Sequence, residues 1–174
     1  MNVVRQGYSQ DGYIIDQARL KDVPYGRRTS DYNGCGWIAA YNFLRCMGER
    51  TSVENVLSAL SKRMFLGGLV GTNPLRLRRY LKKQGYPLHL ALGKKNTIRA
   101  GDGAQAGVVL YRHCNGWHFV TFTRENAGSE LRFLNASPGN ERDIMPMATF
   151  LAQRNLAPVV AAFFIPIKNE ATGD

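Results

Sequence analysis

The chain has 174 residues, of which 44% are hydrophobic, and its formal net charge is +10. This length and apolar content predict a single domain whose core needs no disulfide. The three cysteines follow no paired pattern, which argues against a disulfide framework and indicates a reducing compartment.

Membrane insertion is not expected. No apolar run approaches the roughly 18–20 residues of a transmembrane helix. The first residues also lack the apolar centre of a signal peptide. We therefore expect a cytoplasmic protein, although export by a dedicated secretion system would leave no such mark. Nothing in the sequence predicts the oligomeric state.

The coarse layout of the predicted helices and strands is that of an α+β fold. We expect one domain over residues 1–174, with an N-terminal extension over 1–22, a core over 23–167 and a flexible tail over 168–174. Helices are predicted at 35–47, 53–62, 74–84 and 147–153, and strands at 12–15, 87–92, 107–112, 117–124, 130–135 and 159–167. Thr51 and Glu54 have the spacing of a capping box at the second helix. Thr72 or Asn73 is the expected cap of the third.

A cysteine between two glycines is the most informative feature of the chain. Cys35 follows Gly34, precedes Gly36 and opens a helix that is apolar on all sides, as in a central core helix. Free backbone N–H groups and the positive end of the helix dipole favour a thiolate there. The glycines would leave room for a substrate backbone. An unreactive core cysteine is the competing interpretation.

A histidine and an asparagine on two later strands would complete a catalytic set. His118 lies on the strand at 117–124, and Asn135 ends the next strand. A hairpin centred between Asn126 and Ala127 would place the two directly opposite each other. The Asn135 amide oxygen would then fix the tautomer of the imidazole, and a different turn length would break this pairing. Considered one at a time, His118 is more simply interpreted as a core histidine on a sheet and Asn135 as a polar residue that ends a strand.

The order cysteine, histidine, asparagine resembles that of papain-like cysteine peptidases. The closest resemblance is to the bacterial branch that includes the bacteriocin-processing, double-glycine-leader peptidases. It runs from about residue 23 to 151, and the matching segments are 22–25, 51–54, 71–75, 81–86, 116–120 and 135–139. It implies a helical part with the cysteine helix, packed on an antiparallel sheet that carries the histidine and the asparagine.

The resemblance also implies an activity. Cys35 would attack a peptide or protein amide, His118 would transfer protons and Asn135 would orient His118, without a metal or other cofactor. In this family a glutamine about six residues before the cysteine usually helps to bind the oxyanion. Thr29 occupies that position here, and Gln17 is too far upstream to align without a shift. Asn33 and Thr29 are therefore our candidate donors beside the Cys35 N–H.

The missing glutamine leaves three alternatives open. A different donor serves, the same fold performs glutamine deamidation or transglutaminase-type acyl transfer, or the protein is an inactive peptide-binding relative. For the substrate cleft we expect a small set of glycines and tryptophans: Gly34, Gly36, Trp37, Gly68 and Trp117. The glycine-rich segment 65–71 is expected to be a loop or a plain connector.

The basic residues gather at 27–28, 76–83 and 94–95. The sequence contains no recognised nucleic-acid module, so nucleic acid is not an expected partner. A solvated basic helix face is the simpler interpretation, and attraction of an acidic peptide or protein is the second. Cys114 and His118 have a spacing that metal ligands use, but no second ligand pair accompanies them, so we predict no metal site.

Overall fold

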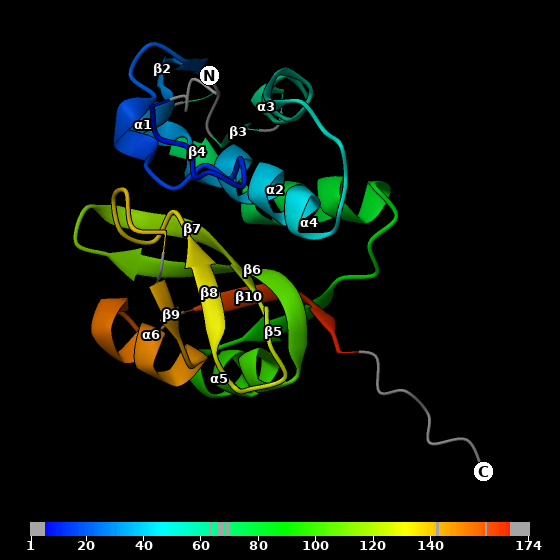
Figure 1. The fold of residues 1–174 in the computed structure, drawn as a ribbon. Helices are drawn as coiled ribbons and strands as arrows, with labels where there is room; N and C mark the ends of the chain where they lie inside the picture. The colour runs from blue at the N-terminus through cyan, green and yellow to red at the C-terminus, as the bar shows by residue number, and fades with distance from the viewer. Residues whose placement is uncertain are drawn as a thin grey trace.

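A six-stranded antiparallel sheet forms the centre of the molecule (Figure 1). In spatial order its strands are β5 (His89–Leu92), β10 (Ala161–Pro166), β6 (Ala104–His113), β7 (Gly116–Thr123), β8 (Leu131–Leu134) and β9 (Asp143–Met145). This computed structural model describes residues 6–62, 64–65, 68, 70–141, 143–158 and 160–167. The mixture of helix and strand confirms the predicted α+β class.

Helices cover both faces of this sheet. On one side lie α1 (Ser30–Asn33), α2 (Cys35–Cys46), α3 (Val53–Ser61) and α4 (Pro74–Lys83), and on the other α5 (Lys94–Asp102) and α6 (Met147–Arg154) (Figure 1). The first side also carries the 3-10 helix η1 (Gln17–Arg19) and two small hairpins, β1 (Pro24–Tyr25) with β2 (Arg28–Thr29), and β3 (Met64–Phe65) with β4 (Val70–Thr72). The sheet therefore separates two hydrophobic cores.

The helix α2 is the centre of the first core, as its apolar sequence predicts. Every residue from Cys35 to Leu44 is buried, and the Thr121 hydroxyl donates to the Ala39 carbonyl oxygen at 2.7 Å. A helix that is apolar on all sides has no face to give to water, so it becomes enclosed between the sheet and the other helices. This packing brings the start of α2 against β7.

The N-terminal segment packs into the fold. The Ile14 side chain is fully buried, and the Asn42 side chain of α2 pairs with both the N–H and the carbonyl oxygen of Ile14 at 2.9 and 2.8 Å. Residues 12–15 do not form the predicted strand, since the described segment makes only an isolated bridge between Tyr8 and Ile14. Residues 1–5 and the predicted tail 168–174 lie outside the described residues.

Most predicted elements are present. Of the two helix caps that we predicted, one is confirmed and the other is wrong. Asn73 caps α4 by accepting from the Leu75 and Arg76 N–H groups at 2.9 and 3.3 Å. The cap of α3 is Ser52, which accepts from the Asn55 N–H at 3.2 Å, so the prediction of Thr51 is wrong.

Several elements were not predicted. On the first side of the sheet they are η1, α1, β2 and the hairpin β3–β4, which overlaps the segment 65–71 that we expected to be a loop. The others are α5 and β9. The helix α5 follows Gly93, which has a φ of +80° and gives no side-chain cap. Within its short polar sequence there is no apolar repeat that marks a helix. β9 has only three residues.

Candidate active site

Cys35 lies at a break between two helices. α1 ends at Asn33, Gly34 separates it from α2, and Cys35 is the first residue of α2. The backbone N–H groups of Cys35, of Gly36 and of Phe119 on β7 are close enough to the Cys35 sulfur to lower the pKa of its thiol. The thiol is therefore held at the contact between the start of α2 and the sheet.

Burial determines the protonation state of this thiol. The Cys35 residue is only 9% exposed, and desolvation raises the pKa of the thiol above its usual value of 9.0. Three backbone N–H groups oppose this effect by lowering the pKa, but desolvation outweighs them. The backbone N–H groups therefore act towards thiolate, as we predicted, while the net shift of the pKa favours the neutral thiol.

His118 is next to this thiol along β7. The Phe119 N–H lies near the Cys35 sulfur, and this nitrogen is joined directly to the carbonyl carbon of His118. Cys35 and His118 are both described, and no hydrogen bond joins their side chains. The ring of Tyr111 packs edge-on against the imidazole of His118, with centroids 5.9 Å apart.

The hydrogen bond of His118 defines its tautomer. The Nε2 atom lies 2.8 Å from the carbonyl oxygen of Asn135. A carbonyl oxygen only accepts, so Nε2 carries the proton and Nδ1 has a free lone pair. Burial lowers the pKa of His118 below 6.5, while the Asn135 bond raises it and His113 lowers it further. A neutral imidazole with a free Nδ1 suits a general base.

Asn135 contacts His118 through a different atom from the one we predicted. Thr121 pairs with Leu134, so the turn is centred between Ala127 and Gly128, one residue later than expected. β8 ends at Leu134, and Asn135 turns out of the strand with a φ of +65°. This turn directs its carbonyl oxygen to His118, while its side-chain amide points elsewhere. The predicted bond from the imidazole to the amide oxygen is wrong.

The Asn135 side chain pairs instead with Gln17. The Gln17 backbone N–H donates to Asn135 Oδ1 at 3.0 Å, and Asn135 Nδ2 donates to Gln17 Oε1 at 3.3 Å. Gln17 Nε2 in turn donates to the Asp31 carbonyl oxygen at 2.9 Å. One network thus connects η1, the turn before α2, β7 and the end of β8.

Gln17 is the residue that our interpretation of the sequence set aside. The hairpin β1–β2 lies between η1 and α1, and it lengthens the chain between the glutamine and the cysteine. Asp31 is four residues before Cys35, so its carbonyl oxygen lies where an unbroken helix would receive the Cys35 N–H. The Gln17 amide occupies that place and lies beside the start of α2.

The two predicted oxyanion donors are engaged in other bonds. Asn33 Nδ2 donates to the Gly68 carbonyl oxygen at 3.1 Å, and Asn33 Oδ1 accepts from the Gly71 N–H at 3.3 Å. The Thr29 hydroxyl donates to the Asp31 carboxylate. Both side chains hold α1 in place, so the expectation that they face a substrate is not met.

The predicted cleft glycines are required for internal packing. A Cβ added at Gly36 would overlap Thr72, and one at Gly34 would overlap the Ser30 carbonyl oxygen. Gly68 is buried, and a Cβ there would meet Gly26 at 3.0 Å. The space that we assigned to a substrate is therefore filled by the protein itself.

The two tryptophans differ in exposure. Trp37 is fully buried, and its indole N–H donates to the Ser30 hydroxyl at 3.0 Å, so it belongs to the core and not to a cleft. Trp117 is 48% exposed on β7, directly before His118. Trp117 is therefore the one predicted cleft residue whose side chain is available to a ligand.

Two further observations bound the site. Among the described residues, no three His, Cys, Asp or Glu side chains converge as metal ligands would. The described helices also include none with the length and apolar content needed to cross a membrane.

Comparison with known proteins adds no assignment. The sequence matches no protein-family model and no curated protein.

Proposed function

We propose that the protein is a cysteine-nucleophile hydrolase of papain-like fold that cleaves a peptide or protein amide bond. The observation that carries this proposal is that the β7 backbone directly after His118 lies against the Cys35 thiol. The tautomer of His118, held by the Asn135 carbonyl oxygen, leaves Nδ1 free to accept the thiol proton. A nucleophile, a base and a group that orients the base are the minimum for such chemistry.

The reaction begins from the neutral pair. His118 Nδ1 takes the proton of the Cys35 thiol as the sulfur attacks the substrate carbonyl carbon, and the carbonyl electrons move to the oxygen. When the tetrahedral intermediate collapses, the C–N bond breaks and the leaving nitrogen takes the proton from His118. Water then hydrolyses the thioester, with His118 again serving as base, and returns the thiol.

Gln17 replaces Asn33 and Thr29 in this proposal as the second oxyanion donor. Its Nε2 lies beside the start of α2, where the Cys35 N–H is the first donor. The amide has two N–H groups, so one bonds Asp31 and the other is available to a substrate oxygen. Loss of one such donor typically lowers the rate by about 100- to 1,000-fold.

Digestion of a proteome-derived peptide library, read by mass spectrometry of new termini, tests the proposal. We expect cleavage by the native chain and by Cys114→Ser, whose thiol is exposed and outside the site. Cleavage should fall by at least about 1,000-fold in Cys35→Ala and in His118→Ala. Native rates in Cys35→Ala would refute the proposal.

A peptide-binding module without catalysis is the second candidate, and the burial of Cys35 favours it. The same library separates the two, because bound but uncut peptides co-elute with the native chain. Release of ammonia from glutamine-containing peptides without chain cleavage would instead identify a deamidase.

A further inference from the structure

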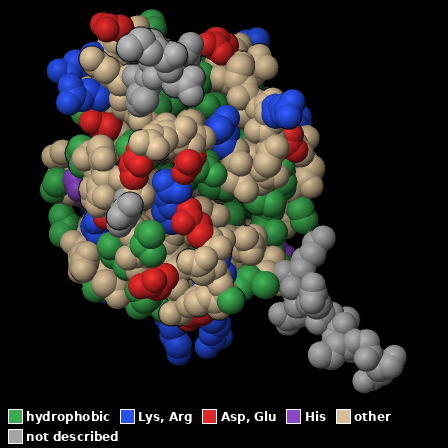
Figure 2. Space-filling view, viewed as in Figure 1, with side chains coloured by type: hydrophobic (Ala, Val, Ile, Leu, Met, Phe, Trp, Pro, Cys, Tyr) green, Lys and Arg blue, Asp and Glu red, His purple; other side chains and the backbone are tan. Residues whose placement is uncertain are grey.

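The entire net charge of the chain originates in one segment. Residues 55–101 contain ten Lys and Arg and no Asp or Glu, so the rest of the chain holds thirteen residues of each sign. The ion pairs of the described residues all join side chains outside this segment. One of its exposed cations, Lys62, follows α3; the others that the structure describes lie on α4 and α5, and they are Arg76, Arg79, Lys82, Lys83, Lys94, Lys95 and Arg99. Figure 2 shows Lys and Arg side chains projecting at the lower end of the molecule, where α5 lies in Figure 1.

The same segment contains an open edge of the central sheet. β5 is the terminal strand and pairs only with β10. The Gly93 N–H donates to the Val160 carbonyl oxygen at 2.7 Å. In an antiparallel pair, every second residue counted from Gly93 directs its N–H and C=O groups at β10, and the residues between them direct these groups away from the sheet. The Leu90 N–H and C=O and the Leu92 N–H therefore point away from the sheet. Asn96 confirms this direction, because its Nδ2 donates to the outward Leu92 carbonyl oxygen at 2.9 Å.

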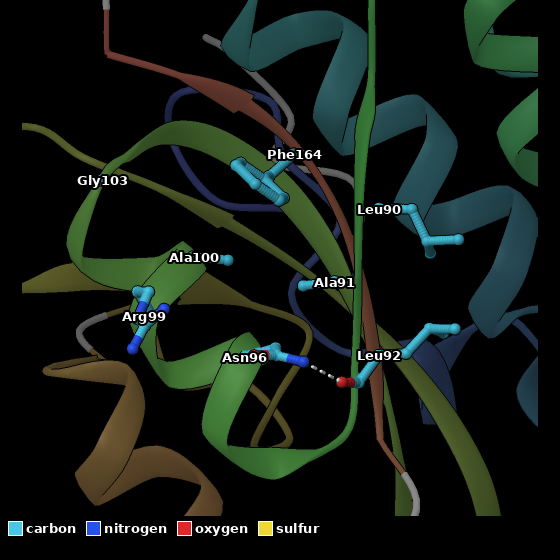
Figure 3. Close-up of a pocket in the computed structure, with 8 residues that line it drawn as sticks. All are labelled: Leu90, Ala91, Leu92, Asn96, Arg99, Ala100, Gly103 and Phe164. Carbon is cyan, nitrogen blue, oxygen red and sulfur yellow. Dashed lines mark hydrogen bonds between the residues drawn. The ribbon is translucent and has the colours of Figure 1, made fainter.

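A groove lies along this edge. Its volume is about 260 Å³, with Ala91, Ala100 and Phe164 as the apolar part and Asn96 and Arg99 as the polar part (Figure 3). Leu90 and Leu92 point to the other side of β5 from Ala91, and they are 41% and 60% exposed. A strand added to β5 would alternate its side chains between Leu90 and Leu92 on one face and the groove with Arg99 on the other.

We propose that the β5 edge binds an extended acidic polypeptide segment by strand addition. Main-chain bonds to Leu90 and Leu92 would supply affinity, and acidic side chains beside Arg99, Lys94 and Lys95 would supply selectivity. Exposed, apolar sheet edges are normally blunted by charge or covered. Here the cations surround the edge and attract chains of opposite sign.

The charge decides between three occupants. A second copy of this chain would bring its own β5 cations against these, and like charges oppose such pairing. A single-stranded nucleic acid would stack its bases on exposed aromatic side chains, and the described Phe, Tyr and Trp side chains of this segment are not exposed. An acidic polypeptide satisfies both the cations and the outward backbone groups.

Binding of three peptides to the full chain tests the proposal. The probes are acetylated, amidated and fluorescently labelled (Val-Glu)₄, its alternately N-methylated analogue and (Val-Lys)₄. We expect (Val-Glu)₄ to bind with a Kd that rises with salt, and at least about tenfold weaker binding for the other two. Bound (Val-Glu)₄ should slow hydrogen exchange at the Leu90 and Leu92 amides, whereas the Ala91 and Gly93 amides are already bonded in the free chain.

A matched pair of charge reversals locates the site. Arg99→Glu should raise the Kd of (Val-Glu)₄ about tenfold, whereas Lys21→Glu, an exposed cation outside the segment, should change it less than about twofold. Equal binding of the N-methylated peptide, unprotected Leu90 and Leu92 amides, concentration-dependent dimers or tighter binding of single-stranded DNA would each overturn it. Cys35→Ala should bind (Val-Glu)₄ as the native chain does, so this result is independent of the proposed catalysis.

Discussion

Asn135 combines two tasks that usually belong to separate residues. Its carbonyl oxygen holds His118, and its side chain pairs twice with Gln17. Its φ of +65° is uncommon for a residue other than glycine, although asparagine tolerates it better than most. The two bonds to Gln17 offset this strain and keep the carbonyl oxygen aimed at the imidazole.

Substitutions at Asn135 separate the backbone task from the side-chain task. Asn135→Gly keeps the left-handed backbone and the acceptor, while Asn135→Ala adds strain of about 1 kcal/mol. We expect the alanine variant to be the less stable of the two by urea unfolding. A double-mutant cycle with Gln17→Ala should give a coupling of about 0.5–3 kcal/mol. Additive effects would mean that the two side chains do not support each other.

The pKa of His118 predicts how acid affects the fold. Burial keeps the imidazole neutral in the folded state, whereas the unfolded chain protonates it near pH 6.5. Below that pH the unfolded state binds more protons, so stability falls by about 1.4 kcal/mol per pH unit until the lower folded pKa is reached. His118→Gln should lose less stability than the native chain between pH 7 and pH 5 in urea titrations. Parallel losses would show that His118 does not contribute.

Residue type and order selected Cys35 and His118 as candidates from the sequence, and their catalytic roles stay a prediction. The bonding atom of Asn135 was not predictable, because a one-residue change in the centre of the turn decides which atom meets the imidazole. Gln17 was missed because the hairpin β1–β2 separates it from the cysteine in sequence but not in space.

At the scale of single elements, α2 and β4 approach each other more closely than a side chain permits. Gly36 contacts Thr72, whose hydroxyl also bonds the Tyr25 hydroxyl at 2.6 Å. The absence of a Cβ at Gly36 therefore lets β4 pack against the first turn of α2. This contact fixes the position of the Cys35 turn relative to the rest of the helical side.

A Cβ at Gly36 should be costly. Gly36→Ala should lower the free energy of unfolding by about 1–3 kcal/mol, because the added atom overlaps Thr72. Gly103→Ala is the matched control, since nothing lies within 4 Å of its Cβ position. Adding Thr72→Gly should recover part of the loss in Gly36→Ala, measured by urea unfolding. If the double variant Gly36→Ala, Thr72→Gly is no more stable than Gly36→Ala alone, the strain does not come from Thr72.

Elements with a strong periodic or capping signal were predicted, and those that depend on tertiary packing were not. α4 has an Asn73 cap, Pro74 in its first turn and basic residues in its last turn, so its bounds were readable. α5 lacks a side-chain cap. It is stabilised as a helix by the burial of Thr97 and Ala100, which is a tertiary interaction.

For the whole molecule, the strand order has a direct consequence for stability. β10 pairs on both sides, with β5 and β6, whereas β5 pairs on one side only. The Leu90 N–H faces away from β10, while Ala162 is fully buried within the sheet. The two strands should therefore respond very differently to the same backbone change.

Proline tests this difference. Ala162→Pro removes a donor in a central strand and should lower stability by about 3 kcal/mol or more. Leu90→Pro removes only an outward N–H and should cost about 1 kcal/mol in urea unfolding. Similar losses for both variants would contradict the strand order.

The position of β10 also sets the timing of assembly during synthesis. Cys35, His118 and Asn135 all leave the ribosome before residues 161–166, which form the strand between β5 and β6. Without that strand, the nascent chain has no Phe163 to complete the core beneath α2. A growing polypeptide therefore contains every proposed catalytic residue before it can gain the ordered arrangement that β10 completes. The proposed activity would then be withheld from the cell until β10 has emerged and paired.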